Sequence, residues 1–89
     1  MKIEFDQKKA SSNLKKHGVT FTDAASVLLD AMALAREDDD AEGEARFLVV
    51  GVSSTGHMLT VCYVLTGDEA IRLISARPAT KNERRQYES

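Results

Sequence analysis

The stretch RFLVVGVSSTGHMLTVCYVL, residues 46–65, decides the fold of this chain. Residues 46–53 and 58–65 are rich in Val, Phe, Leu, Tyr and Thr, most of which favour β-strands. Residues 54–57, Ser-Thr-Gly-His, join the two runs with turn-forming residues. This pattern predicts an antiparallel hairpin of two strands.

A third strand is expected directly after this hairpin. Residues 66–69 contain a second turn signal and residues 70–76 again favour a strand, so the three runs predict a β-meander. Arg77 and Pro78 are expected to end this strand, because proline has no amide proton to donate to a sheet. Strand alternation puts Arg72 and Arg77 on opposite faces if the strand stays regular, and a bulge or bend near Ser75 would change that.

Two helices are expected ahead of the sheet. Residues 3–5 alternate as a short strand, and Asp6 is a good N-cap for a helix over residues 7–17, which a glycine follows. Thr22 is the candidate N-cap of a second helix that ends near Asp30, and the two helices form a hairpin.

A weak strand signal covers residues 33–37, and a third helix closes the chain. Thr80 and Glu83 match a capping box, which predicts a helix from Lys81 to about Tyr87. The order is then β-α-α-β-β-β-β-α. Because two helices precede a meander, we expect an α+β fold: a single domain over residues 1–89 with an antiparallel sheet and helices packed on one face.

The composition is that of one globular domain. With 89 residues, 43% hydrophobic and 29% charged, the chain is neither collagen-like nor wholly disordered. It has no run of about 18 apolar residues, which a membrane helix needs, and the first residues lack the apolar core of a secretory signal. Cys62 is the only cysteine, which excludes a disulfide within one chain and fits a reducing cytoplasm.

The net charge of −2 conceals two basic ends around an acidic middle. Residues 1–20 carry five lysines against two acids, residues 21–70 two arginines against ten acids, and residues 71–89 five basic residues against two acids. Six of the acids fall within residues 37–44, where self-repulsion predicts a mobile surface loop. The basic ends favour nucleic-acid binding if folding brings them together, and are otherwise solvated faces.

Few residues have the spacing of a known chemical motif. His17, His57 and Cys62 lack the spacing of metal ligands, so no metal and no cofactor is expected. Cys62 lies in mid-strand and is expected in the core, whereas His57 in the hairpin turn is expected to be exposed. His17, at a helix C-terminus, is either a charge-stabilised cap or a catalytic group.

What remains is a set of cations with one phenol. Arginine forks match phosphate oxygens bidentately, so a cluster of them would stabilise the charge that develops in phosphoryl transfer, although a solvated surface also fits such residues. Glu83 or Glu44 would orient an arginine or accept a proton. The set comprises Arg46, Arg72, Arg77, Arg84, Arg85, Lys81 and Tyr87.

Four strings in this chain resemble the signatures of the BrnT toxins. They are NLKKHGVTF at residues 13–21, EAR at 44–46, IRLISAR at 71–77 and ERRQY at 83–87. The strings occur in the family's order and spacing, and the resemblance runs from Ile3 to Tyr87. It therefore covers almost the whole chain.

The resemblance implies a RelE-like ribonuclease fold in a type II toxin–antitoxin system, and inhibition of translation by RNA cleavage. It also implies a BrnA-like antitoxin with a ribbon-helix-helix DNA-binding region, so that operator DNA is reached only through the antitoxin. A homodimer or a 2:2 complex with the antitoxin is the corresponding assembly, in the cytoplasm and without a membrane partner.

The expected reaction is metal-independent: the RNA 2′-hydroxyl attacks the adjacent phosphate and expels the 5′-oxygen. The expected catalytic residues contact the phosphate or transfer a proton, and are Arg46, Arg72, Arg77, His17 and Glu44. Lys16 is expected to bind the RNA backbone, and Arg84 to make a supporting contact to the phosphate. Tyr87 is expected to stack on a base or donate a proton. Lys81 is the fourth expected RNA-binding residue.

Two other functions fit the same sequence. Thr66 and Pro78 stand where the family commonly has basic residues, which favours a catalytically weak interaction module that acts as a co-repressor with a DNA-binding antitoxin. A ribosome- or RNA-associated protein would instead bind RNA with a strong dependence on salt and cut nothing.

Overall fold

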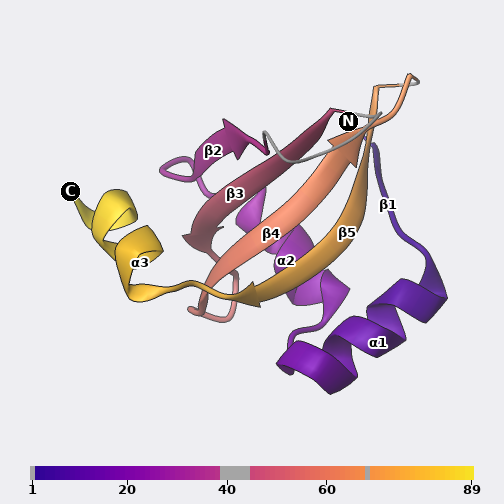
Figure 1. Ribbon diagram of the computed structural model, residues 1–89, viewed down its shortest axis with the longest axis horizontal. Helices are drawn as coiled ribbons and strands as arrows, with labels where there is room; N and C mark the ends of the chain where they lie inside the picture. The colour runs from indigo at the N-terminus through magenta and orange to yellow at the C-terminus, as the bar shows by residue number, and fades with distance from the viewer. Residues whose placement is uncertain (1, 39–44, 68) are drawn as a thin grey trace.

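The computed structural model describes residues 2–38, 45–67 and 69–89 of the chain. Its element order is the predicted one, and it builds a five-stranded sheet of order β1-β5-β4-β3-β2 (Figure 1). The elements are β1 (Lys2–Glu4), α1 (Gln7–His17), α2 (Phe21–Val27), β2 (Leu34–Glu37), β3 (Arg46–Val52), β4 (Met58–Leu65), β5 (Ala70–Pro78) and α3 (Lys81–Glu88). No helix among these residues is long and apolar enough to cross a membrane.

The predicted hairpin forms between β3 and β4. Val49 pairs with Val61, and the turn closes where the Ser53 amide donates to the His57 carbonyl at 2.8 Å. Gly56 has a φ of 85° there, a left-handed conformation that glycine adopts without a Cβ clash. The hairpin is therefore the local unit on which the rest of the sheet is built.

The sheet is antiparallel except at one edge. β1 pairs with β5 in parallel, with Glu4 opposite Arg72. The chain leaves β1 through two helices and three further strands before it returns to this edge, so no tight turn forces the two strands to run in opposite directions. The acidic run from Asp39 onward, with Glu44, and the turn residue Asp68 lie outside the described residues.

A bulge interrupts the ladder between β4 and β5. Tyr63 pairs with Leu73, but the preceding residue of β4, Cys62, pairs with Ser75. Ile74 is the extra residue, and an extra residue reverses the alternation of all side chains that follow it. Arg72 and Arg77 consequently lie on the same face of the sheet, as a bulge near Ser75 requires, rather than on opposite faces.

The main core lies between the sheet and the first two helices. Phe21, Ala24 and Val27 of α2 pack against Val61 and Leu73, and all five are 2% exposed or less. In Figure 1 α2 lies behind β3, β4 and β5, and α1 lies at the β5 side.

The second helix begins earlier than the sequence suggested. Its N-cap is Thr20, whose hydroxyl accepts a hydrogen bond from the Asp23 amide at 3.1 Å. Thr22, the predicted cap, lies within the helix. The reason is that Phe21 enters the core as the first helical residue, so burial of its ring fixes the helix start.

α3 occupies a different position from α1 and α2. Its Glu83 accepts a hydrogen bond from Thr60, whose side chain points away from the α2 side because its neighbour Val61 points toward it. Helices α1 and α2 thus share one face, while α3 contacts the other near one end of the sheet (Figure 1). β5 also continues to Pro78, which pairs with Leu59 at the end of the ladder, where a missing amide proton costs little.

Candidate functional site: an arginine face, a lysine groove and a histidine cavity

Three of the predicted catalytic residues share one face of the sheet. We call it the arginine face: the side of β3, β4 and β5 turned away from α2, with Arg46, Thr60, Cys62, Val64, Arg72 and Arg77. Arg46 and Arg72 pair with Val64 from its two sides, which separates their Cα atoms by about 10 Å. Arg77 pairs with Thr60, four residues along β4 and about 13 Å away. The three arginines line one surface without meeting at one point.

Arg46 is a half-buried residue of this face. Its Nε is shielded from solvent and has no hydrogen-bond partner among the described residues. Burial raises the pKa of the neighbouring Cys62 thiol, and the positive charge of Arg46 acts in the opposite direction. Cys62 is buried, as predicted, so the chemistry available here is that of the guanidinium, a donor with an unused N–H.

Arg72 is held by a carboxylate from β1. Its Nε and Nη2 donate to Glu4 Oε1 at 3.2 and 3.1 Å. The Arg72 side chain is 48% exposed, and ion pairs this open to water contribute little to stability. A phosphate can therefore compete with Glu4 for this guanidinium at small energetic cost.

Arg77 is held more firmly. Its Nη1 and Nη2 donate to Glu83 Oε1 and Oε2 at 2.7 and 3.0 Å, in the bidentate geometry that fits a guanidinium to a carboxylate. Glu83 also accepts hydrogen bonds from the Thr80 amide and the Thr60 hydroxyl, both at 2.8 Å. The Arg77 hydrogen bond, the largest cause, and these further donors lower the pKa of Glu83 to about 2. Glu83 therefore orients an arginine, one of its two predicted roles, and is too weak a base for the other.

A groove lined by cations runs beside α1. We call it the lysine groove; its volume is about 320 Å³, and it lies between α1 and the bulged part of β5. Three lysines and one histidine contribute to its wall, from three turns of the same helix. The lining residues are Lys8, Lys9, Ser12, Asn13, Lys16, His17, Ile74 and Ser75.

Asn13 fixes α1 in this position. Its side chain is buried, and its Nδ2 donates to the Val19 and Ala76 carbonyls at 3.0 and 2.8 Å, while its Oδ1 accepts from the Ala76 amide at 3.0 Å. Because residues four apart share a helix face, this anchor also sets the position of His17. In the sequence Asn13 stands out only as part of the family-like string at residues 13–21, and its buried amide is a structural finding.

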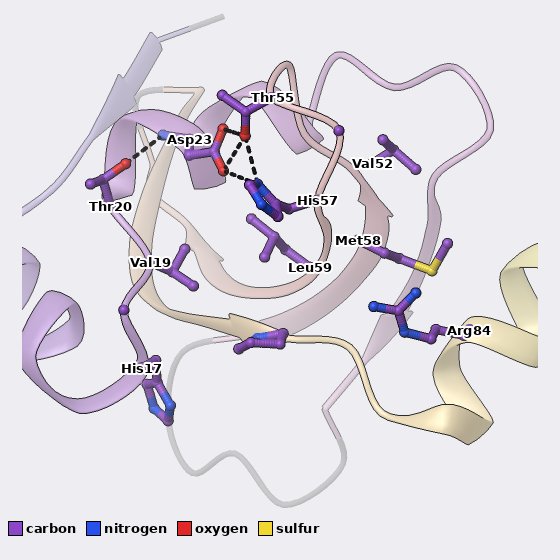
Figure 2. Close-up of a pocket in the computed structure, with 13 residues that line it drawn as sticks. His17, Val19, Thr20, Asp23, Val52, Thr55, His57, Met58, Leu59 and Arg84 are labelled. Carbon is purple, nitrogen blue, oxygen red and sulfur yellow. Dashed lines mark hydrogen bonds and ion pairs between the residues drawn. The ribbon is translucent and has the colours of Figure 1, made fainter.

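A second hollow, which we call the histidine cavity, lies between the end of α1, the β3–β4 turn and α3. Its volume is about 520 Å³. Two of the predicted residues, His17 and Arg84, lie in its wall together with Asp23 and His57, which sequence reasoning left out of the site (Figure 2). Because His17 lines both hollows, the lysine groove and the histidine cavity adjoin each other.

His57 is linked to α2 through one hydroxyl. Thr55 Oγ1 lies 2.9 and 3.0 Å from the two Asp23 carboxylate oxygens and 2.8 Å from His57 Nδ1. Figure 2 shows Thr55 above the two side chains that it joins. The only sequence signal was a histidine in a turn next to two hydroxyl residues, which by itself is typical of an exposed loop.

The remaining predicted residues lie elsewhere. Tyr87 donates its hydroxyl proton to Asp30 Oδ2 at 2.6 Å, a contact that ties α3 to the segment between α2 and β2. This hydrogen bond is the largest cause of a raised Tyr87 pKa and a lowered Asp30 pKa. Lys81 is exposed at the start of α3, and Glu44 lies outside the described residues. Within the described ranges no three His, Cys, Asp or Glu side chains are grouped to hold a metal ion.

The comparisons with known proteins agree with this architecture. The crystal structure of the Brucella abortus ribonuclease toxin BrnT superposes with a TM-score of 0.66 at 28% sequence identity, and the match covers 91% of this chain and 99% of that one. No curated protein matches by sequence. The family model described as "Ribonuclease toxin, BrnT, of type II toxin-antitoxin system" matches residues 5–83. This chain therefore belongs to the BrnT family of ribonuclease toxins of type II toxin–antitoxin systems.

Proposed function

We propose that this toxin is a metal-independent endoribonuclease of the cytoplasm that uses the RNA 2′-hydroxyl as its nucleophile. In such a reaction the protein has to bind the backbone, neutralise charge on the phosphate and move two protons. Guanidinium and imidazole groups can do all three. The described residues hold both kinds of group around adjoining hollows.

The observation that carries this proposal is the junction at His17. The lysine groove and the histidine cavity have one wall residue in common, because His17 lines both. A single strand whose backbone contacts Lys8, Lys9 and Lys16 would place its next phosphate beside His17, at the cavity that Arg84 lines from another side. The arrangement combines backbone binding with a group able to transfer a proton.

The arginine face supplies further phosphate contacts in this proposal. Arg46 is one of them, because its Nε has no hydrogen-bond partner among the described residues. Arg72 and Arg77 contact flanking phosphates or the transition state with the N–H groups that Glu4 and Glu83 leave available. Lys81 and Tyr87 of α3 are proposed as outer RNA contacts, and Glu44 as a group that orients an arginine or accepts a proton.

The proposed antitoxin is a BrnA-like protein with a ribbon-helix-helix region, in a 2:2 complex with the toxin. Covering the lysine groove with an acidic or amphipathic segment would neutralise the toxin by excluding RNA. The free toxin should then bind RNA and the complex should not. Simultaneous binding of RNA and antitoxin would contradict this mode of neutralisation.

The direct test is to induce the chain alone and follow growth, and to incubate the purified protein with RNA in the presence of EDTA. We expect growth arrest, and RNA cleavage that the chelator does not affect. Loss of all cleavage with EDTA, restored by a divalent metal, would contradict the metal-independent mechanism.

One observation favours a second function. Arg72 and Arg77 are each paired with a carboxylate of the same chain, which lowers the positive charge of the arginine face. A catalytically weak module that acts as a co-repressor with its antitoxin would tolerate this pairing. That function predicts no growth arrest and no RNA cleavage by the free chain, but tight binding to the antitoxin.

A further inference from the structure

The histidine cavity contains an imidazole that is held in a defined orientation. We propose that His57 is a further catalytic residue of this toxin: the general base that takes the proton from the RNA 2′-hydroxyl. The inference rests on the proposed ribonuclease function. It adds a residue that the sequence analysis expected only to be exposed in a turn.

The turn that carries His57 is fixed to α2 by several hydrogen bonds. The Thr55 hydroxyl lies against the Asp23 carboxylate, the Ser54 amide donates to Ser26 Oγ at 2.8 Å, and the His57 amide donates to Ser53 Oγ at 3.2 Å. The first two bonds anchor the turn to α2 and the third braces the turn internally, and such a turn holds its residues in place far better than a free loop. His57 is thus an exposed side chain on a fixed backbone.

The hydrogen bonds define which imidazole nitrogen is free. A carboxylate only accepts, so the single Thr55 hydroxyl proton points to Asp23, at 2.9 and 3.0 Å. Thr55 Oγ1 must then accept from His57 Nδ1, 2.8 Å away, so Nδ1 carries a proton. In the neutral ring the other nitrogen, Nε2, consequently bears a lone pair. The contacts with Asp23 and Thr55 therefore prepare Nε2 to accept a proton.

The cavity also holds the other groups that the reaction needs. His17 comes from the end of α1 and Arg84 from α3, and both line the same cavity as His57, from different sides of it (Figure 2). The volume of about 520 Å³ lies within the range of small-ligand sites. The side chain of His57 is 71% exposed and that of Asp23 only 17%, so the imidazole is accessible while its orienting carboxylate is shielded.

The substrate bond in this step is a phosphodiester between two ribonucleotides. His57 Nε2 takes the proton of the 2′-hydroxyl, and the 2′-oxygen forms a bond to phosphorus. The bond between phosphorus and the 5′-oxygen breaks, and that oxygen takes a proton from protonated His17. The products are a 2′,3′-cyclic phosphate and a 5′-hydroxyl, and Arg84 contacts the non-bridging oxygens, whose charge increases in the transition state.

The test is single-turnover cleavage of a short RNA by the full chain in EDTA. His57→Ala should slow cleavage by about 10²–10³-fold, the usual contribution of a general base. Because the side chain is exposed, free imidazole should restore part of the His57→Ala rate. Ser54→Ala, a neighbour whose side chain faces solvent in the same turn, is the matched control and should cleave at the wild-type rate.

Asp23 and Thr55 are positioning residues, and Thr55 offers a conservative rescue. Thr55→Val removes the hydroxyl and should slow cleavage by about tenfold or more, whereas Thr55→Ser keeps the hydroxyl and should retain the wild-type rate. Equal rates for Thr55→Val and Thr55→Ser would contradict the orienting role.

The outcomes separate this inference from the proposed function. Cleavage by the wild-type chain with an unchanged rate for His57→Ala would overturn the role of His57 and leave the ribonuclease proposal intact. A wild-type chain that cleaves no RNA would overturn both. A slow His57→Ala variant that unfolds like the wild type and responds to imidazole supports the inference.

Discussion

Arg77 and Glu83 join the end of the sheet to the last helix through two parallel hydrogen bonds, of 2.7 and 3.0 Å. The same carboxylate completes the capping box of α3 with Thr80. One side chain therefore both starts a helix and orients an arginine of the proposed RNA surface. In the proposed function, stability and activity are therefore coupled at this position.

The low pKa of Glu83 predicts a specific dependence of stability on pH. Its pKa is lowered from 4.5 to about 2, so the ionised form stabilises the folded chain above pH 4.5 and this contribution is lost as the pH falls toward 2. Glu83→Gln should lower the free energy of unfolding at pH 7 by about 2 kcal/mol, after allowance for the partial exposure of Arg77. Urea unfolding at several pH values measures this difference.

The difference between the wild type and Glu83→Gln should shrink between pH 4.5 and 2. Glu88→Gln, on the same helix but exposed, serves as the control and should change little at any pH. A deficit for Glu83→Gln that stays constant down to pH 2.5 would show that the charge of Glu83 is not what stabilises this junction.

Arg46 should contribute to cleavage through its fork of N–H groups. Arg46→Ala should reduce the cleavage rate by about 10²-fold, in the range seen when one donor to a developing charge is removed. Arg46→Lys keeps the charge without the fork and should recover only part of the rate. Arg36→Ala, an exposed arginine of the edge strand β2, is the control. Full activity of Arg46→Ala would remove this residue from the mechanism.

If the lysine groove binds the RNA backbone, its lysines should contribute to the salt dependence of RNA affinity. Each lysine–phosphate contact contributes about 0.7 to the slope of log affinity against log salt for single strands. Lys16→Ala should lower the slope by about this amount, whereas Lys15→Ala, on the same helix but outside the groove, should not. Fluorescence anisotropy with an uncleavable 2′-deoxy oligonucleotide measures both, and identical slopes for the two variants would reject the groove as the backbone site.

Asn13 should be the most sensitive polar residue of the fold. Asn13→Ala leaves the Val19 and Ala76 carbonyls and the Ala76 amide without their side-chain partner. We expect a loss of about 2–4 kcal/mol in unfolding free energy, and less than about 0.5 kcal/mol for the exposed Ser11→Ala. Thermal or urea unfolding measures these free energies. A small loss for Asn13→Ala would mean that water replaces the hydrogen bonds of the amide.

Local patterns were enough to predict most of the fold. Turn chemistry and strand composition predicted the hairpin from Arg46 onward, and the capping box predicted α3 to within one residue. The parallel edge and the side of the sheet that α3 contacts were beyond such patterns, because both depend on how distant segments meet. The bulge at Ile74 could not be predicted for the same reason. The sequence is compatible with a bulge, but its position depends on the pairing of β5 with β4.

The candidate site divides along the same line. The arginines and His17 could be selected from charge and residue type, because cationic side chains are the ones that bind phosphate. His57 had no such signal, because its orientation depends on a carboxylate 34 positions earlier in the chain, in α2, reached through the Thr55 hydroxyl. Sequence spacing shows the residues of one element and not the contacts between elements.

The 2′-hydroxyl nucleophile is tested most directly by a single-atom change in the substrate. An RNA cleaved by the purified chain in EDTA should be prepared again with one 2′-deoxy nucleotide on the 5′ side of the cut. The account predicts that cleavage at this bond stops while other sites are still cut, and that the normal product ends in a 2′,3′-cyclic phosphate. Continued cleavage at the deoxy position would contradict it.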